Sequence, residues 1–362
     1  MEPIRPEVMI SQVEGLAGDL REQTGPVSDR VAGLLTPQEW AAAGTVYLTG
    51  DGDSYHAACA AEMAFESIAG VACEPLSALR FLEYGAPWLR TAGSLRPLVI
   101  GISASGSTQR VAQAIESARQ HGALTVAVTG TAGGAVTRAA ERAVVIELPR
   151  PEPSPGIRTY QASLLGLLLA AIRLGEARGQ YPELQARGLR GELVTLADAV
   201  EATAAGIKDR CREAASVAAG NPVLVMTGSG PSYGTALFAA AKMTEAAGVF
   251  AAGQDLEEWF HVESHAYPDD MPVFVIAPPG RSHWRAAGLA AAARQRGRQV
   301  IAVTREDDTD VAGHAHIALP VTGHAREEFS PLLYHVFAGY VASYLAERLG
   351  RLPFQADRPA QR

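Results

Sequence analysis

The sequence LVIGISASGSTQR at residues 98–110 joins an apolar run to a hydroxyl-rich turn and then to the start of a helical pattern. The apolar run predicts a buried parallel strand, and residues 109–119 predict a helix that begins directly after the turn. Free backbone N–H groups at a helix start, together with the positive end of the helix dipole, attract an anion. An ordinary N-cap explains one serine here. Four hydroxyl groups within residues 103–108 supply further donors, and they favour a phosphate-binding turn.

Strand and helix patterns alternate on both sides of this turn. Strands are expected at residues 45–49, in a short stretch directly after residues 69–71, and at 124–128 and 143–148, with helices between them. The pattern then restarts, with strands expected at 222–227, 272–278 and 300–304 and helices at 233–246 and 283–295. This alternation predicts an α/β fold with parallel, doubly wound sheets.

The restart contains an internal repeat. TGDGDSYHAACAAEMAFESIAGV at residues 49–71 corresponds to TGSGPSYGTALFAAAKMTEAAGV at residues 227–249, with the T-G-x-G-x-S-Y motif and the closing A-G-V in common. The chain is therefore expected to hold two copies of one α/β unit. The second copy has APPGR at residues 277–281 in place of the hydroxyl turn, so only the first copy is expected to bind phosphate.

These patterns predict two tandem doubly wound parallel-sheet domains with flanking helices. The length of 362 residues and a hydrophobic content of 48% suit two cores. The expected divisions are an N-terminal helical segment at 1–40, a first, phosphate-binding domain at 41–182, a helical linker at 183–219, and a second domain with a C-terminal helix and tail at 220–362.

The composition of the chain limits the kinds of partner that it is expected to bind. The net charge of −8, with no basic cluster, argues against nucleic acid or an anionic membrane as partner. The longest apolar run, residues 162–172, is about half a membrane span and predicts a buried helix. Three widely spaced cysteines form no metal-ligand pattern, so no metal is expected. Their odd number and an N-terminus unlike a signal peptide indicate the reducing cytoplasm.

Two stretches of the second copy carry candidate chemical groups. Lys242 and Glu245 are three residues apart on an expected helix and so share one face. A solvated ion pair is the ordinary interpretation. However, this helix should pack on the sheet, where unpaired charge is costly, and partial burial raises a carboxylate pKa toward that of a general base. His261 follows Trp259 and Phe260, and it is either a proton shuttle or a histidine packed against these rings.

The doubled unit, the S-x-S-G-x-T turn and the K-x-x-E helix with a histidine sixteen residues after its glutamate resemble the sugar isomerase (SIS) superfamily. The likeness covers residues 40–360 and is to the isomerase half of glucosamine-6-phosphate synthase and to the fructosamine-6-phosphate deglycases. The resemblance implies that the phosphosugar is bound by the turn and by the first S-Y motif, at Ser54, Ser103, Ala104, Ser105 and Thr108.

The resemblance also assigns catalytic roles in the second copy. Glu245 matches the base that moves a proton between the first and second carbons of an open-chain sugar, and Lys242 matches a lysine beside it. His261 matches a histidine that assists ring opening and that comes from a neighbouring subunit, which implies a homodimer with shared active sites. No cofactor is implied.

The sequence departs from the family pattern at three places. Ser107 stands where a glutamate usually follows S-x-S-G, and His261 is followed by Val262 and Glu263 where the family has H-G-P. The tail at 357–362 ends before the position of the lysine with which synthases form a Schiff base. A transaminating synthase is therefore not expected.

The expected function is a phosphosugar aldose–ketose isomerase, or a deglycase or deaminase of an amino-sugar phosphate, that works by ring opening and C1–C2 proton transfer. The alternative is a non-catalytic phosphosugar-binding protein, as in regulators that share this unit. Such regulators would carry a DNA-reading helix-turn-helix, and residues 1–40 are too short and insufficiently basic for one.

Overall fold

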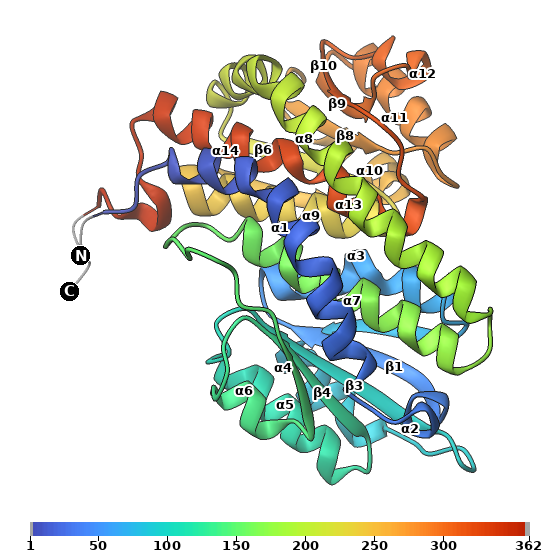
Figure 1. The fold of residues 1–362 in the computed structure, drawn as a ribbon. Coiled ribbons are helices and arrows are strands. Elements are labelled where there is room, and N and C mark those ends of the chain that lie inside the picture. The colour runs from blue at the N-terminus through green and yellow to red at the C-terminus, as the bar shows by residue number, and fades with distance from the viewer. Residues whose placement is uncertain (1–2, 359–362) are drawn as a thin grey trace. The chain divides into compact units, whose positions relative to one another are not determined.

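A computed structural model describes residues 3–358 and contains two five-stranded parallel sheets (Figure 1). The chain forms two compact units, one around each sheet. Unit A consists of Gly18–Arg150 and Arg158–Thr195. Unit B consists of the chain up to Ala17, Pro151–Ile157, and the chain from Leu196 onward. The α/β class with two doubly wound parallel sheets is thus confirmed.

Unit A has the strand order β2-β1-β3-β4-β5 with every neighbouring pair parallel. Its strands are β1 (Ala43–Gly50), β2 (Ala72–Ser77), β3 (Arg96–Ser103), β4 (Leu124–Thr129) and β5 (Arg142–Val145). Its helices are α2 (Pro37–Ala41), α3 (Asp53–Ser67), α4 (Ala78–Tyr84), α5 (Gln109–Gln120), α6 (Ala135–Ala139), α7 (Arg158–Ala177) and the 3-10 turn η1 (Ala86–Trp88). Two longer helices, α1 (Val8–Ala32) and α8 (Glu183–Ala219), contribute residues to both units.

Unit B repeats this plan with the order β10-β9-β8-β6-β7. Its strands are β6 (Val223–Thr227), β7 (Phe250–Gln254), β8 (Pro272–Ala277), β9 (Gln299–Arg305) and β10 (Ile317–Val321). Its helices are α9 (Pro231–Ala247), α10 (Leu256–His261), α11 (His283–Gln295), α12 (Thr309–Ala312), α13 (Pro331–Tyr334) and α14 (Val336–Leu349), with 3-10 turns η2 (Glu263–His265), η3 (Glu327–Phe329) and η4 (Pro353–Gln355).

The central strands are buried because helices cover both faces of each sheet. Every residue of β4 and β8 is buried, and so is all of β3 except its first residue. A continuous apolar strand of this kind is typical of a parallel sheet. Helix α5 packs so closely on β3 that a side chain at Gly101 would bring its Cβ within 2.3 Å of Ile115 Cδ1. Gly101 therefore allows α5, the helix that follows the hydroxyl turn, to pack directly against β3.

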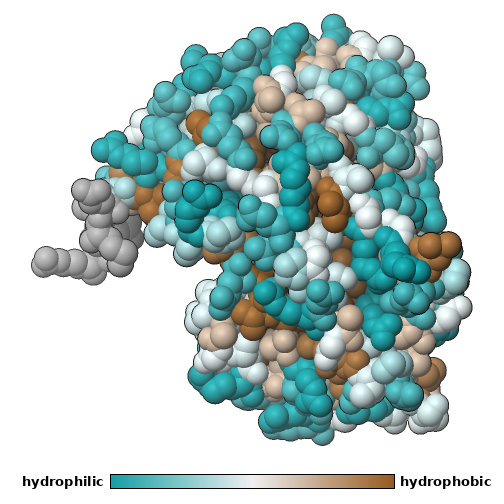
Figure 2. Space-filling model, in the orientation of Figure 1, coloured by the Kyte–Doolittle hydropathy of each residue, from teal (hydrophilic) through white to brown (hydrophobic). Residues whose placement is uncertain are grey.

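Two strands, β7 and β10, go beyond the sequence prediction, and both lie at an edge of the second sheet. None of the described helices has the length and apolar character needed to cross a lipid bilayer. The face drawn in Figure 2 is mostly hydrophilic, with apolar residues in separate small groups. The three cysteines are buried free thiols. Residues 359–362 lie outside the described part of the chain, so the prediction about the C-terminal tail stays a prediction.

Candidate functional site

A cavity of about 230 Å³ opens in unit A where β1 and β3 end. It brings together all five phosphosugar-binding residues expected from the sequence. The lining consists of Asp51, Asp53, Ser54, Ser103, Ala104, Ser105, Thr108, Thr159, Tyr160 and Ser163. Because β2 lies on one side of β1 and β3 on the other, the cavity is at the topological switch point of the sheet, where open α/β folds bind ligands.

The turn between β3 and α5 forms one wall of the cavity. Gly106 has φ +67°, a left-handed conformation that a glycine adopts without strain, and it turns the chain toward the helix. The Oγ of Ser103 lies 2.9 Å from the Oγ1 of Thr108, which is the N-cap of α5. Ser105 and Ser107 form a second hydroxyl pair at 2.9 Å. The turn therefore presents paired hydroxyl groups directly before the first helical N–H groups.

The S-Y motif at the start of α3 forms a second wall. Gly52 caps this helix with φ +56°, and Ser54 lies in its first turn with only 8% of its surface exposed. Gly50 allows the strand and the helix to meet, since a Cβ there would lie 2.7 Å from the Cβ of Ser54. Asp51 and Asp53 place carboxylates beside these hydroxyls, a feature that the sequence prediction did not include among the site residues.

A third wall comes from α7. Thr159 and Ser163 are four residues apart and so face the same way, with Tyr160 beside them. The start of α7 is held by a bidentate ion pair in which Arg158 donates to both carboxylate oxygens of Asp19 at 2.6 Å. None of these lining residues was a sequence prediction.

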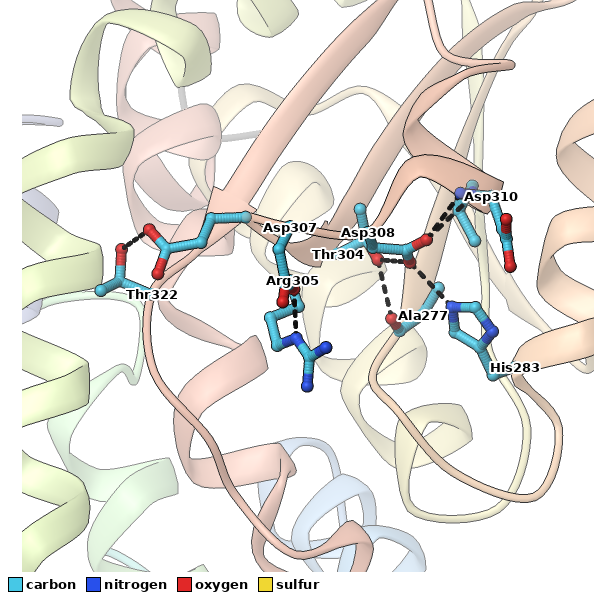
Figure 3. A network of polar contacts seen from close by, with 10 residues as sticks. Ala277, His283, Thr304, Arg305, Asp307, Asp308, Asp310 and Thr322 are labelled. Atoms are coloured by element: carbon cyan, nitrogen blue, oxygen red, sulfur yellow. Dashed lines mark hydrogen bonds and ion pairs between the residues drawn. The ribbon is translucent and has the colours of Figure 1, made fainter.

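Unit B has a polar network at the ends of β8 and β9 (Figure 3). In this network His283 Nε2 lies 2.7 Å from Asp308 Oδ2, and Thr304 donates to the same carboxylate. Burial opposes the ionisation of Asp308, but hydrogen bonds from Thr304, His283 and the Val311 N–H lower its pKa.

Unit B contains the lysine and glutamate expected to act together. Lys242 Nζ lies 2.5 Å from Glu245 Oε2 on α9. The lysine side chain is fully buried beside the ring of Phe238, whereas 30% of the glutamate side chain is exposed. This is not the solvated ion pair of the ordinary interpretation, because one partner has lost all contact with solvent. The pair presents an anchored carboxylate at the surface of the helix.

His261 is the last residue of α10, and its side chain is 66% exposed. This exposure excludes the alternative of a histidine packed against the neighbouring rings. Its Nε2 lies 3.4 Å from Glu257 Oε1. The helix ends at His261, and His265 lies in the 3-10 turn η2, so the two histidines do not share a face of one helix. Among the described residues, no group of three or more His, Cys, Asp or Glu is placed to hold a metal ion.

Arg298 supports the segment that follows His261. It is 2% exposed, and its guanidinium donates to the backbone carbonyls of Glu263, Ser264, Ala266 and Pro268. Burial lowers the pKa of this arginine. Sequence reasoning did not include Arg298, because a single arginine before a strand gives no sign that it turns inward.

Comparison with known proteins follows the same division into two copies. The SIS domain model matches residues 40–173 and 221–346, more than half of the chain. A glutamine–fructose-6-phosphate aminotransferase (isomerizing) from Pyrococcus horikoshii is 28% identical over 316 residues, which cover 87% of this chain and 50% of that protein. The chain thus spans about half the length of the curated relatives it matches.

Solved structures share the fold across almost the whole chain. A tagatose-6-phosphate ketose/aldose isomerase from Escherichia coli has a TM-score of 0.75 at 17% identity and covers 99% of this chain and 97% of its own. A glucosamine-6-phosphate deaminase from Thermotoga maritima has a TM-score of 0.72 at 16% identity, with coverages of 98% and 97%. With the model match to both copies, these likenesses lead to one conclusion: the chain belongs to the SIS domain family.

Proposed function

We propose that this protein is an enzyme that binds a phosphorylated sugar or amino sugar and moves a proton between its first and second carbons. The Lys242–Glu245 pair carries the proposal. A fully buried ammonium fixes the carboxylate at 2.5 Å, and the carboxylate stays partly exposed to solvent. A general base needs this combination of fixed position and access.

The hydroxyl cavity of unit A would bind the phosphate. Ser54, Ser103, Ser105 and Thr108 offer side-chain hydroxyls there, and Ala104 offers backbone groups. Binding the phosphate away from the reacting carbons supplies energy that can hold the sugar in place while the proton moves.

The proposed reaction begins with ring opening, assisted by His261 of a neighbouring copy in a homodimer. Glu245 then takes the proton from the second carbon of the open aldose and returns it to the first carbon, so an enediol becomes a ketose. With an amine on the second carbon, the same transfer gives an enolamine and then an imine. Water hydrolyses the imine and releases the amine.

Two structural relatives bear names that fit the two outcomes, a ketose/aldose isomerase and a deaminase. Both reactions need the same proton transfer at the same carbons. The proposal therefore includes both, and the product of the assay below separates them.

Glu245→Gln tests the base. Wild-type protein should exchange a carbon-bound proton of a hexose or amino-hexose 6-phosphate with deuterated water, as followed by NMR. The variant keeps the shape of the side chain but cannot accept a proton, so exchange should fall by at least about a hundredfold while phosphate binding is retained.

Glu213→Gln is the matched control, because Glu213 forms an ion pair of the same i,i+3 spacing with Arg210, with both side chains more than half exposed. Its exchange rate should equal that of wild type. If Glu245→Gln exchanged the proton as fast as wild type, Glu245 would not be the base. Tight sugar-phosphate binding by wild type without exchange of any substrate would instead identify a non-catalytic binding protein.

A further inference from the structure

Ser163 lines the cavity of unit A with a buried hydroxyl group that has no partner of its own. The residue is 5% exposed and belongs to the α7 wall of the cavity. Its Oγ has no hydrogen bond to any residue that the structure describes. A buried hydroxyl without a partner costs free energy. A ligand in the cavity can supply the missing hydrogen bond.

Hydroxyl groups inside other helices of this chain bond to their own backbone. Thr24, Ser67 and Ser216 each donate to the carbonyl four residues earlier in the chain. The carbonyl of Thr159 is in the same position relative to Ser163, but that bond is not made. The hydroxyl of Ser163 is therefore available to a ligand.

Helix packing places Ser163 on the face of α7 that rests on the sheet. A Cβ at Gly166, three residues later on this face, would lie 2.8 Å from Ile146 Cδ1 and 3.1 Å from Val128 Cγ1. Ser163 is also the only polar residue in the run at 162–172. Its surroundings within the protein are thus apolar, and the cavity is the side from which a hydrogen-bond partner can come.

The place of Ser163 along α7 favours a neutral partner. Only the first N–H groups of a helix are free to bind an anion, and Ser163 is the sixth residue of α7, beyond them. The hydroxyl turn before α5 does offer such N–H groups, so the phosphate fits there. A hydroxyl group of the sugar fits Ser163, because two hydroxyls can each donate to and accept from the other.

We propose that Ser163 is a specificity-determining residue that hydrogen bonds to the hydroxyl on the third or fourth carbon of the phosphosugar. This inference rests on the proposed function, because it takes the cavity as the substrate site. In a hexose 6-phosphate these two hydroxyls lie between the phosphate and the carbons that exchange the proton. Their configuration distinguishes one hexose from another, so a hydrogen bond to either of them selects among substrates.

Titration calorimetry tests the inference by removing each partner in turn. The ligands are the tighter-binding of glucose 6-phosphate and galactose 6-phosphate, its 3-deoxy and 4-deoxy analogues, and inorganic phosphate. We expect Ser163→Ala to bind the complete sugar phosphate about fivefold more weakly than wild type, the range of a neutral hydrogen bond. For one deoxy analogue the two proteins should bind equally, because its missing hydroxyl is the partner of Ser163. Inorganic phosphate should also bind equally to both.

The stability of the ligand-free protein gives a second measurement. Because the Ser163 hydroxyl has no partner there, Ser163→Ala should melt at a temperature no lower than that of wild type. Ser216→Ala is the matched control, since it removes a helical hydroxyl that bonds to the Arg212 carbonyl outside the cavity lining. All affinities of this control should equal those of wild type.

The outcomes separate the two proposals. If Ser163→Ala weakens the complete sugar phosphate and both deoxy analogues equally, weakens inorganic phosphate, or changes no affinity, the inference is overturned and the proposed function stands. Wild type that binds both deoxy analogues as tightly as the complete sugar phosphate also overturns the inference alone. Failure of every hexose 6-phosphate to bind wild type overturns both.

Discussion

The hydroxyl groups of the turn after β3 differ in burial and in their importance for the structure of the turn. Ser103 is 2% exposed and hydrogen bonded to Thr108, so it belongs to the structure of the turn itself. Ser105 is exposed and pairs with Ser107 at 2.9 Å. Ser105 can therefore lose its hydroxyl without leaving a buried polar group unsatisfied.

We expect Ser105→Ala to weaken the binding of sugar phosphates about tenfold, because a hydrogen bond to a charged phosphate is lost. Titration calorimetry with a phosphorylated sugar and its unphosphorylated form measures the effect, which should be confined to the first. Ser67→Ala on α3 is the control, since the Ser67 hydroxyl is exposed and bonds to the Met63 carbonyl. An unchanged affinity in Ser105→Ala would argue against phosphate binding at this turn.

A buried histidine is predicted to make the folded protein less stable at acidic pH. His335 is fully buried, its Nδ1 lies 2.9 Å from the Pro331 carbonyl oxygen, and its ring meets Phe238 edge-on at 5.8 Å. Burial lowers the pKa of His335 from 6.5 to about 4. The unfolded chain therefore takes up a proton at a higher pH than the native protein does.

This order of protonation determines how the stability of the protein changes with pH. Stability contributed by neutral His335 is complete above pH 6.5 and is lost as the pH falls toward 4. The loss amounts to about 3 kcal/mol of unfolding free energy. His335→Phe, neutral at every pH, should flatten the pH dependence of urea-unfolding midpoints in this window, and His335→Gln should do the same. Slopes as steep as that of wild type would assign the acid sensitivity to other groups.

Among elements, the segment after α10 depends most on one side chain. Arg298 donates to four carbonyls within residues 263–268, a segment that begins two residues after His261. Backbone in an irregular segment has few partners of its own, so the guanidinium supplies the hydrogen bonds that a helix or strand would otherwise provide. Arg298 is thus a positioning residue for the end of α10.

Arg298→Met leaves those carbonyls without their donor. We expect a lower melting temperature and at least about a tenfold loss of turnover, with little change in KM because the phosphate site lies in unit A. Arg298→Lys should recover part of the turnover, since it keeps the charge but not the planar fork. Arg296→Met, at an exposed neighbouring position, is the control. A fall in stability with full turnover would limit Arg298 to a structural role.

The sequence predicted the central strands of both sheets but missed the two edge strands of the second sheet. Apolar runs identified β3, β4, β8 and β9, because strands buried on both faces need such runs. The edge strand β10 contains Pro320, which cannot donate to a ladder and which argues against a strand. The edge strand β7 contains Gly253, where a Cβ would lie 2.8 Å from the Leu237 backbone of α9. That glycine reflects helix packing, which the local sequence does not reveal.

The same limit applies to the site. Spacing alone put Lys242 and Glu245 on one helical face, and their contact follows from it. Complete burial of Lys242 depends on tertiary packing and could not be predicted. The walls contributed by Asp51 and by α7 reach the cavity only once the sheet has formed, so no local pattern included them.

At the scale of the whole molecule, the proposed reaction uses a histidine from a second copy of the chain. A two-fold dimer would build two equivalent sites, each with Glu245 of one chain and His261 of the other. The exposure of His261 leaves its imidazole available to such a partner.

Subunit mixing tests this arrangement. Glu245→Gln and His261→Asn homodimers should each be nearly inactive. A heterodimer of the two, co-expressed with different tags and purified by both, has one site with both mutations and one with neither. It should show about half of wild-type exchange by NMR, since one of its two sites is intact. A heterodimer as inactive as its parents would place both residues in a site formed within one chain.

Unit B is assembled from distant parts of the chain. The Ser343 hydroxyl of α14 donates to the Pro6 carbonyl at 2.9 Å, and a Cβ at Gly339 would lie 2.5 Å from Val13. The residues up to Ala17 therefore belong to a unit whose remaining sequence begins at Pro151 and continues from Leu196.

On the ribosome, this connectivity means that the N-terminal part of unit B, up to Ala17, is synthesised well before the residues that bury it. Residues 3–17 leave the exit tunnel before any of unit A, yet α14, against which Pro6 and Val13 pack, is made after the whole of unit A. At about 5–20 residues per second, translation from Ala17 to Val336, the start of α14, takes roughly 16 to 64 seconds. During that time the apolar side chains of this N-terminal segment have not yet met α14, so chaperones that bind nascent chains can bind them.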